Sequence, residues 1–149
     1  MKIYLFIILI FLSAYTLFAQ SEMETTYSNQ CPIILVHGFG GWGTDELLGY
    51  KYWGGIALDI QKFLRTKKFK VETATVGPLS SNHDRACELF YQIKGGQVDY
   101  GVAHAQEAKH NRLGRKFTGL YKEWDVRHPV HLIGHSMGGF LPVHYASAF

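Results

Sequence analysis

One serine lies in a pattern that hydrolytic enzymes use to build a nucleophile. Gly134, Ser136 and Gly138 form a G-x-S-x-G sequence directly after the apolar run at residues 130–133. In this pattern the serine lies on a sharp turn between a strand and a helix, so its hydroxyl projects above the edge of the sheet. Glycines on both sides allow neighbouring backbone to pass close by. The pattern predicts a nucleophile at Ser136, with the Met137 N–H directed at a substrate carbonyl oxygen.

A second glycine-rich turn follows an earlier apolar run. Residues 32–36 read PIILV, which is typical of a strand buried on both faces, and His37-Gly38-Phe39 comes next. A loop of this kind supplies the second oxyanion-hole donor of a serine hydrolase, here the Phe39 N–H. We expect His37 to hold this loop through a hydrogen bond.

The same turn also matches the dinucleotide-binding pattern, with glycines at positions 38, 40 and 43. That pattern requires a helix opening at the third glycine and an acidic residue about 20 positions later, at the end of a second strand. Residues 44–53 show no helical period, and Asp59 falls inside a predicted helix. The sequence therefore disfavours dinucleotide binding.

Strand and helix patterns alternate along the rest of the chain. Strands separated by helices pair in parallel through crossover connections, so the predicted class is α/β. Residues 97–117 show no regular period, and we expect an irregular loop there. The other predicted elements are an amphipathic helix over residues 54–65, a strand over 71–76, a helix over 84–94 with its cap at 80–82, and a short helix over 119–124.

The N-terminus has the features of a secretory signal peptide. Lys2 precedes an apolar run at residues 3–12, and small Ala19 ends the segment. The run is shorter than the roughly 20 apolar residues of a membrane-spanning helix. We therefore expect a signal peptide at residues 1–19, a flexible lead-in at 20–31 and one domain from 32 to 149, in a secreted protein.

Charge and cysteine content constrain the partners only loosely. The formal net charge of +3 gives no reason to expect nucleic acid, and no stable protein partner is indicated. Cys31 and Cys87 could form one disulfide in an oxidising compartment. Their spacing does not decide between a disulfide and two thiols.

Several longer segments resemble secreted bacterial lipases of the thermoalkalophilic and staphylococcal type. They occur in that family's order and at close to its spacing. The resemblance implies an α/β-hydrolase fold, of which this chain holds the N-terminal part, and hydrolysis of triacylglycerol esters at a lipid–water interface through an acyl-enzyme on Ser136. The segments are PIILVHGF at 32–39, GWG at 41–43, KYWGG at 51–55, GPLSSN at 77–82, DRACE at 84–88, VDYG at 98–101 and GHSMG at 134–138.

The resemblance also implies a structural zinc site. Three of the family's four ligands match Asp84, His104 and His110, and the fourth ligand, an aspartate, falls beyond residue 149. Members of the family also bind calcium, through residues that would likewise lie beyond this chain. His83 replaces a tryptophan that usually precedes the aspartate ligand, so it could supply a further nitrogen ligand.

The remaining catalytic groups of such a lipase are not found after Ser136. A catalytic acid and a histidine follow the nucleophile in α/β-hydrolases, but residues 137–149 contain no Asp or Glu and only His144. We expect an N-terminal part of a lipase precursor, with residues 20–149 inactive when isolated. The alternative is a truncated, non-catalytic hydrolase module that binds zinc or a lipid surface.

Overall fold

A parallel sheet forms the centre of the fold. The computed structural model describes residues 30–43 and 46–141. Its main sheet contains three strands in the order β2-β1-β5, with β1 (Ile33–Val36) between β2 (Val71–Ala74) and β5 (His131–Gly134). Both neighbours run parallel to β1. The three strands predicted from apolar runs are therefore confirmed, as is the α/β class with a parallel sheet.

The strand register brings two glycine-rich turns together at one edge of the sheet. Val36 pairs with Gly134, and the His135 N–H donates to the Val36 carbonyl oxygen at 3.0 Å. The turns that follow β1 and β5 therefore leave the sheet side by side. In parallel α/β sheets, this carboxyl edge is where ligands bind.

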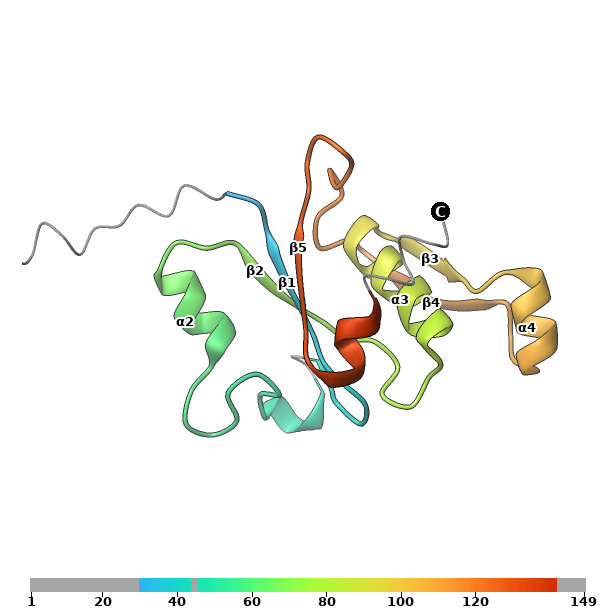
Figure 1. The fold of residues 1–149 in the computed structure, drawn as a ribbon, viewed down its shortest axis with the longest axis horizontal. Coiled ribbons are helices and arrows are strands. Elements are labelled where there is room, and N and C mark those ends of the chain that lie inside the picture. Colours follow the sequence, from blue (N-terminus) through green and yellow to red (C-terminus); the bar gives the residue numbers. More distant parts are fainter. Residues whose placement is uncertain (1–29, 44–45, 142–149) are drawn as a thin grey trace, which may run out of the picture. The chain divides into compact units, whose positions relative to one another are not determined.

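Helices cover both sides of the sheet (Figure 1). The longer one, α3 (Asn82–Lys94), is capped by Ser81, whose Oγ accepts the Asp84 N–H. Its buried stripe packs against the face of β1 that carries Ile34 and Val36. The shorter helix, α2 (Ile60–Thr66), packs against β2. The predicted helix at residues 84–94 is confirmed, and it begins two residues earlier.

The predicted helix at residues 54–65 starts too early. Its first turn begins only at Ile60, where the Asp59 carboxylate accepts the Lys62 N–H at 2.9 Å. Gly54 and Gly55 have φ values of +115° and +62°, which a right-handed helix does not allow. Ile56 is 91% exposed and so does not belong to the buried stripe. A 3₁₀ turn, η1 (Leu47–Gly49), lies upstream of these glycines.

The segment predicted to be irregular, residues 97–117, is regular. It forms β3 (Gly96–Asp99), α4 (Val102–Ala108) and β4 (Leu113–Phe117), and β3 pairs antiparallel with β4. Figure 1 shows α4 at the far end of this hairpin. The prediction was wrong because two short, mostly exposed strands carry little apolar alternation, and their pairing spans a helix.

The prediction of a short helix at residues 119–124 is also wrong. The N–H groups of Leu120 and Tyr121 donate to the carbonyl oxygens of Gln92 and Ile93, each at 2.9 Å. Those carbonyls belong to the last turn of α3 and have no partner within that helix. The segment therefore completes the end of α3 instead of forming a helix of its own.

Several expectations concern residues outside the described ranges. The signal peptide, most of the lead-in and His144 all lie there. Within the described ranges, Cys87 is a free thiol, so it forms no disulfide with Cys31. No described helix is long and apolar enough to cross a bilayer.

Candidate active site and metal site

The turn after β5 places Ser136 in a strained and accessible position. Ser136 has a φ of +55°, a left-handed conformation that costs energy for a residue with a Cβ. Its side chain is exposed. A Cβ on Gly134 would overlap the backbone of Gly138, and one on Gly138 would overlap the carbonyl oxygens at the end of β1. The two glycines of the motif are therefore required by close backbone approach.

The turn after β1 lies against Ser136. A Cβ built on Gly38 would lie 2.9 Å from the Ser136 Cβ and 2.9 Å from the His135 carbonyl oxygen. Phe39, the next residue, is 67% exposed. The structure thus brings together the two turns that carry Ser136, Met137 and Phe39.

Buried His37 sets the direction of the Phe39 N–H. Its Nε2 accepts the Val76 N–H at 3.3 Å, so the proton is on Nδ1, which donates to the Gly38 carbonyl oxygen at 2.9 Å. The Gly41 N–H binds the same oxygen at 3.2 Å. Because a trans peptide is planar, the Phe39 N–H points away from this locked carbonyl. The expectation that His37 holds the loop by a hydrogen bond is confirmed.

Burial also determines the charge of His37. The side chain is fully buried, and this burial lowers its pKa below the usual value, with the nearby Arg85 guanidinium adding to the effect. The ring is therefore neutral at pH 7, as its two hydrogen bonds require. A neutral His37 keeps the loop geometry constant across the neutral pH range.

Met137 offers the second candidate donor from the start of a short helix. The 3₁₀ helix η2 (Ser136–Phe140) follows β5. The bond from the Gly138 N–H to the His135 carbonyl oxygen, at 2.9 Å, is the one that opens this turn. The Met137 N–H precedes it, and N–H groups in the first turn of a helix have no partner within the helix.

Arg85 of α3 anchors the loop after β1, Glu88 of the same helix anchors the turn at Gly77, and the sequence analysis missed both. Arg85 is fully buried and donates to the carbonyl oxygens of His37 and Gly77, each at 2.6 Å. Glu88 accepts the Gly77 N–H and the Tyr100 hydroxyl, the latter at 2.9 Å. Both side chains fall on the buried stripe of the helix. A helical projection of residues 82–94 would have marked them as charges directed inward.

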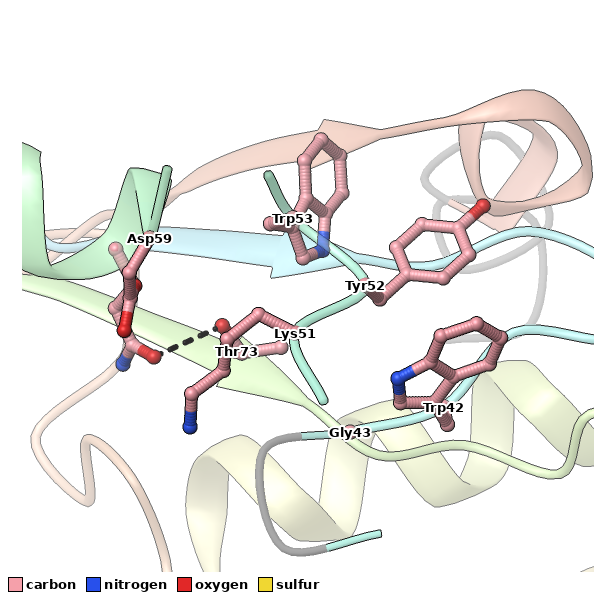
Figure 2. A pocket seen from close by; sticks show the side chains of 8 residues that line it. Trp42, Gly43, Lys51, Tyr52, Trp53, Asp59 and Thr73 are labelled. Carbon is pink, nitrogen blue, oxygen red and sulfur yellow. Dashed lines mark hydrogen bonds between the residues drawn. The ribbon is translucent and has the colours of Figure 1, made fainter. Parts of the chain in front are cut away.

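Aromatic side chains pack beside the two turns. Tyr52 makes edge contacts with Trp42 and Trp53, at ring-centroid distances of 5.4 and 5.7 Å. Behind them lies a cavity of about 10 Å³, which Thr73 and Asp59 also line (Figure 2). This volume suits about one water molecule, so the cavity cannot accept an acyl chain. Around this cavity the aromatic rings pack against one another.

The three predicted metal ligands converge on one point. The Nε2 atoms of His104 and His110 lie 2.9 and 3.4 Å from Oδ1 of Asp84. One ligand atom from each residue lies within 4.8 Å of the others. The sequence analysis expected an irregular loop for both histidines. Instead His104 lies on α4, and His110 follows the left-handed Lys109 that ends this helix.

Hydrogen bonds orient two of these three side chains. The Ser81 hydroxyl donates to Oδ2 of Asp84 at 2.8 Å, and Oδ1 faces the two imidazole rings. His110 Nδ1 donates to the Asn111 carbonyl oxygen at 2.8 Å, so its Nε2 carries a free lone pair. Partners of this kind fix the tautomer of a histidine that ligates a metal. One carboxylate and two imidazoles suit Zn²⁺.

His83 lies beside the cluster but is not part of it. Its ring stacks on His104 with a centroid distance of 4.0 Å. Its Nε2 donates to the Tyr100 carbonyl oxygen at 2.9 Å, so this nitrogen is not free for a metal. His83 therefore packs its ring against the cluster, as an aromatic residue at this position would.

Comparisons with known proteins identify the family to which this chain belongs. Residues 29–143 match the family model for a lipase-like, C-terminal domain. Lipase 1 of Staphylococcus aureus is 48% identical over 116 residues, which cover 76% of this chain and 17% of that lipase. The chain therefore spans less than a fifth of the length of this curated relative.

Solved structures of bacterial proteins also match this chain. EstA from Clostridium botulinum matches with a TM-score of 0.73 and 59% identity, over 76% of this chain and 26% of that one. The Staphylococcus hyicus lipase matches with a TM-score of 0.76 and 44% identity, over 79% of this chain and 31% of that one. By sequence and by structure, the chain belongs to the family of lipase-like C-terminal domains, with bacterial lipases as its relatives.

Proposed function

We propose that this chain carries the nucleophile, the oxyanion hole and the metal ligands of a secreted serine lipase with an α/β-hydrolase fold. The observation that carries the proposal is the contact between Gly38 and Ser136. It brings the candidate nucleophile next to the loop whose Phe39 N–H has a locked direction. The names of the relatives support lipase activity.

The reaction would proceed in two steps. Ser136 Oγ attacks the carbonyl carbon of the ester, and its proton passes to a histidine from a part of the protein outside the described residues. The N–H groups of Phe39 and Met137 donate to the oxyanion, and each such donor contributes about 10²–10³ in rate. The same histidine then protonates the departing alkoxide. Water hydrolyses the acyl-enzyme and restores Ser136.

The substrate would be a triacylglycerol or shorter acyl ester at a lipid–water interface. Nothing in the charge pattern favours nucleic acid, and we propose no stable protein partner. Secretion is supported by the signal-peptide pattern at residues 1–19. The domain would begin at residue 32, after a flexible lead-in.

We further propose that Asp84, His104 and His110 hold a structural zinc ion. Their mutual geometry and their oriented lone pairs fit this ion. When bound, zinc would join α3 to α4 and the turn after it, and would stabilise the β3–β4 hairpin. A fourth ligand, and any calcium site, would come from residues outside the described ranges.

The nucleophile is tested by Ser136→Ala in the full-length protein. We expect loss of essentially all hydrolysis of p-nitrophenyl esters and of a triacylglycerol emulsion, with zinc content unchanged. A fluorophosphonate probe should add one label per wild-type chain and none to the variant. Thr66→Ala, which removes an exposed hydroxyl on α2, is the control and should keep full activity.

Two results would overturn the proposal in different ways. Hydrolysis that survives Ser136→Ala would show that another residue is the nucleophile. A folded wild-type protein that binds zinc, takes up no probe and hydrolyses no ester would instead indicate the non-catalytic module.

A further inference from the structure

The Tyr52 hydroxyl joins the two turns of the candidate active site. It accepts the Gly38 N–H at 3.0 Å and lies 2.6 Å from Nδ1 of His135. The hydroxyl hydrogen can be donated to Nδ1, and a neutral His135 would then carry its proton on Nε2.

The hydroxyl is held in place by a packed ring. Tyr52 contacts Trp42 and Trp53 edge-on, and its ring lies 5.7 Å from His37 and 5.8 Å from His135. Figure 2 shows the hydroxyl directed away from Asp59 and Thr73, on the far side from the small cavity. A ring packed in this way has few alternative rotamers. The hydroxyl therefore presents one fixed position to both turns.

The Tyr52 hydroxyl bridges Gly38 and His135, and the location of this bridge matters. The pairing of β1 with β5 ends just before Phe39 and Ser136. Paired β1 and β5 residues end at Val36 and Gly134, followed by the bond from His135 to Val36. Beyond that point, Tyr52 joins Gly38 to His135. Each of these residues directly precedes an active group, namely Phe39 with its donor N–H and Ser136 with its hydroxyl.

We propose that Tyr52 is a positioning residue that sets the separation between the oxyanion loop and the nucleophile turn. This inference rests on the proposed function. The hydroxyl touches neither substrate nor reacting atoms; it acts through the backbone of Gly38 and the ring of His135. Its loss would loosen the alignment of the Phe39 N–H with the oxyanion that forms on the ester carbonyl when Ser136 attacks, while the aromatic packing remains.

The test is Tyr52→Phe in the full-length protein, which removes the hydroxyl and keeps the ring. Small displacements of positioning groups lower rates steeply, and we expect kcat to fall about tenfold with KM unchanged. The exchange of the Gly38 amide hydrogen should accelerate, and the His135 Nδ1 resonance in a ¹⁵N NMR spectrum should shift. The melting temperature should change no more than in the control.

Tyr50→Phe is the matched control. Tyr50 belongs to the same aromatic group, at 5.9 Å from Trp42, and its hydroxyl lies beside Gly55. It should leave kcat, Gly38 exchange and the His135 resonance unchanged.

The outcomes separate this inference from the proposed function. If wild-type protein hydrolyses no ester, the proposed function fails, and the Gly38 and His135 measurements still decide whether the bridge exists. If Tyr52→Phe leaves either Gly38 exchange or kcat unchanged, the positioning role is wrong. A large fall in melting temperature that accompanies the loss of kcat would also overturn it, since Tyr52 would then act on folding.

Discussion

Arg85 Nη2 donates to the main-chain carbonyl oxygen of His37 at 2.6 Å, from a fully buried side chain. This bond ties helix α3 to the loop that carries the candidate oxyanion donor. The guanidinium also binds the Gly77 carbonyl oxygen. Burial lowers the pKa of Arg85, and neighbouring Glu88 opposes this effect. The charge is thus retained inside the protein by carbonyl dipoles and by one nearby carboxylate.

Replacing Arg85 should destabilise the protein strongly. Arg85→Met leaves the buried carbonyl oxygen of His37 and the partly buried one of Gly77 without their donor, and each such loss costs about 1–3 kcal/mol. We expect the free energy of unfolding in urea to fall by about 3 kcal/mol. Arg115→Met is the control, because exposed Arg115 also donates to a carbonyl oxygen, that of Thr75 at 3.0 Å. Its loss should stay below about 1 kcal/mol, and equal losses in the two variants would contradict the buried anchor.

Adding a methyl group at Gly38 should damage catalysis more than stability. A Cβ there meets Ser136 and the His135 carbonyl oxygen, so the loop must move away from the nucleophile. For Gly38→Ala we expect kcat/KM for an ester to fall about 100-fold. Gly40→Ala is the comparison: φ is +64° but no atom lies within 4 Å of the added Cβ. It should lose about 1 kcal/mol of stability and keep its activity, and equal activities in the two variants would refute the contact.

Zinc should be present at one ion per chain in full-length protein purified without chelators, as elemental analysis would measure. His104→Ala or His110→Ala should lower both zinc occupancy and melting temperature, because each removes one of the three converging ligands. His128→Ala should change neither, since His128 pairs with Asp125 on the exposed surface. Protein without zinc that loses no stability in EDTA at constant calcium would rule out the site.

Stability should decrease in mild acid because of His37. Its folded pKa is lowered by burial, so below about pH 6.5 the unfolded chain binds a proton that the folded chain does not. The free energy of unfolding therefore rises with pH up to about 6.5, with a slope of at most about 1.4 kcal/mol per pH unit from this residue. Urea unfolding at pH 5.5 and 7.5 would measure the difference.

His37→Gln provides the reference, because a neutral amide can donate and accept but does not titrate. The pH dependence of wild type minus that of the variant isolates His37 from the other histidines. If the variant does not fold, an NMR titration of His37 in the wild-type protein still shows whether its ring is protonated in the folded state. A ring that is protonated at pH 6.5 in the folded protein would contradict the prediction.

Local patterns in the sequence were sufficient for the elements nearest the candidate site. The apolar runs identified β1, β2 and β5, since strands buried in a parallel sheet need continuous apolar side chains. The cap at residues 80–82 and the apolar stripe identified α3. The serine motif also located the turn after β5, because its glycines reflect the close backbone contacts of that turn.

Other parts of the fold depend on contacts between distant residues. The β3–β4 hairpin forms because Gly96 pairs with Phe117 across an intervening helix, and such pairing leaves no periodic signal. The 119–124 segment is apolar enough for a helix, but its amides bind the end of α3. Arg85 was overlooked because a buried arginine is rare and requires partners that only the folded chain supplies.

The residues of the candidate site were thus determined by the sequence, and their relationships by the tertiary structure. Resemblance to lipases selected Asp84, His104 and His110, but the chain's path through α4 brought their ligand atoms together. The Tyr52 bridge joins residues 83 positions apart. Hydrogen bonds of this kind depend on where the backbone places donor and acceptor in space, and no local spacing encodes that distance.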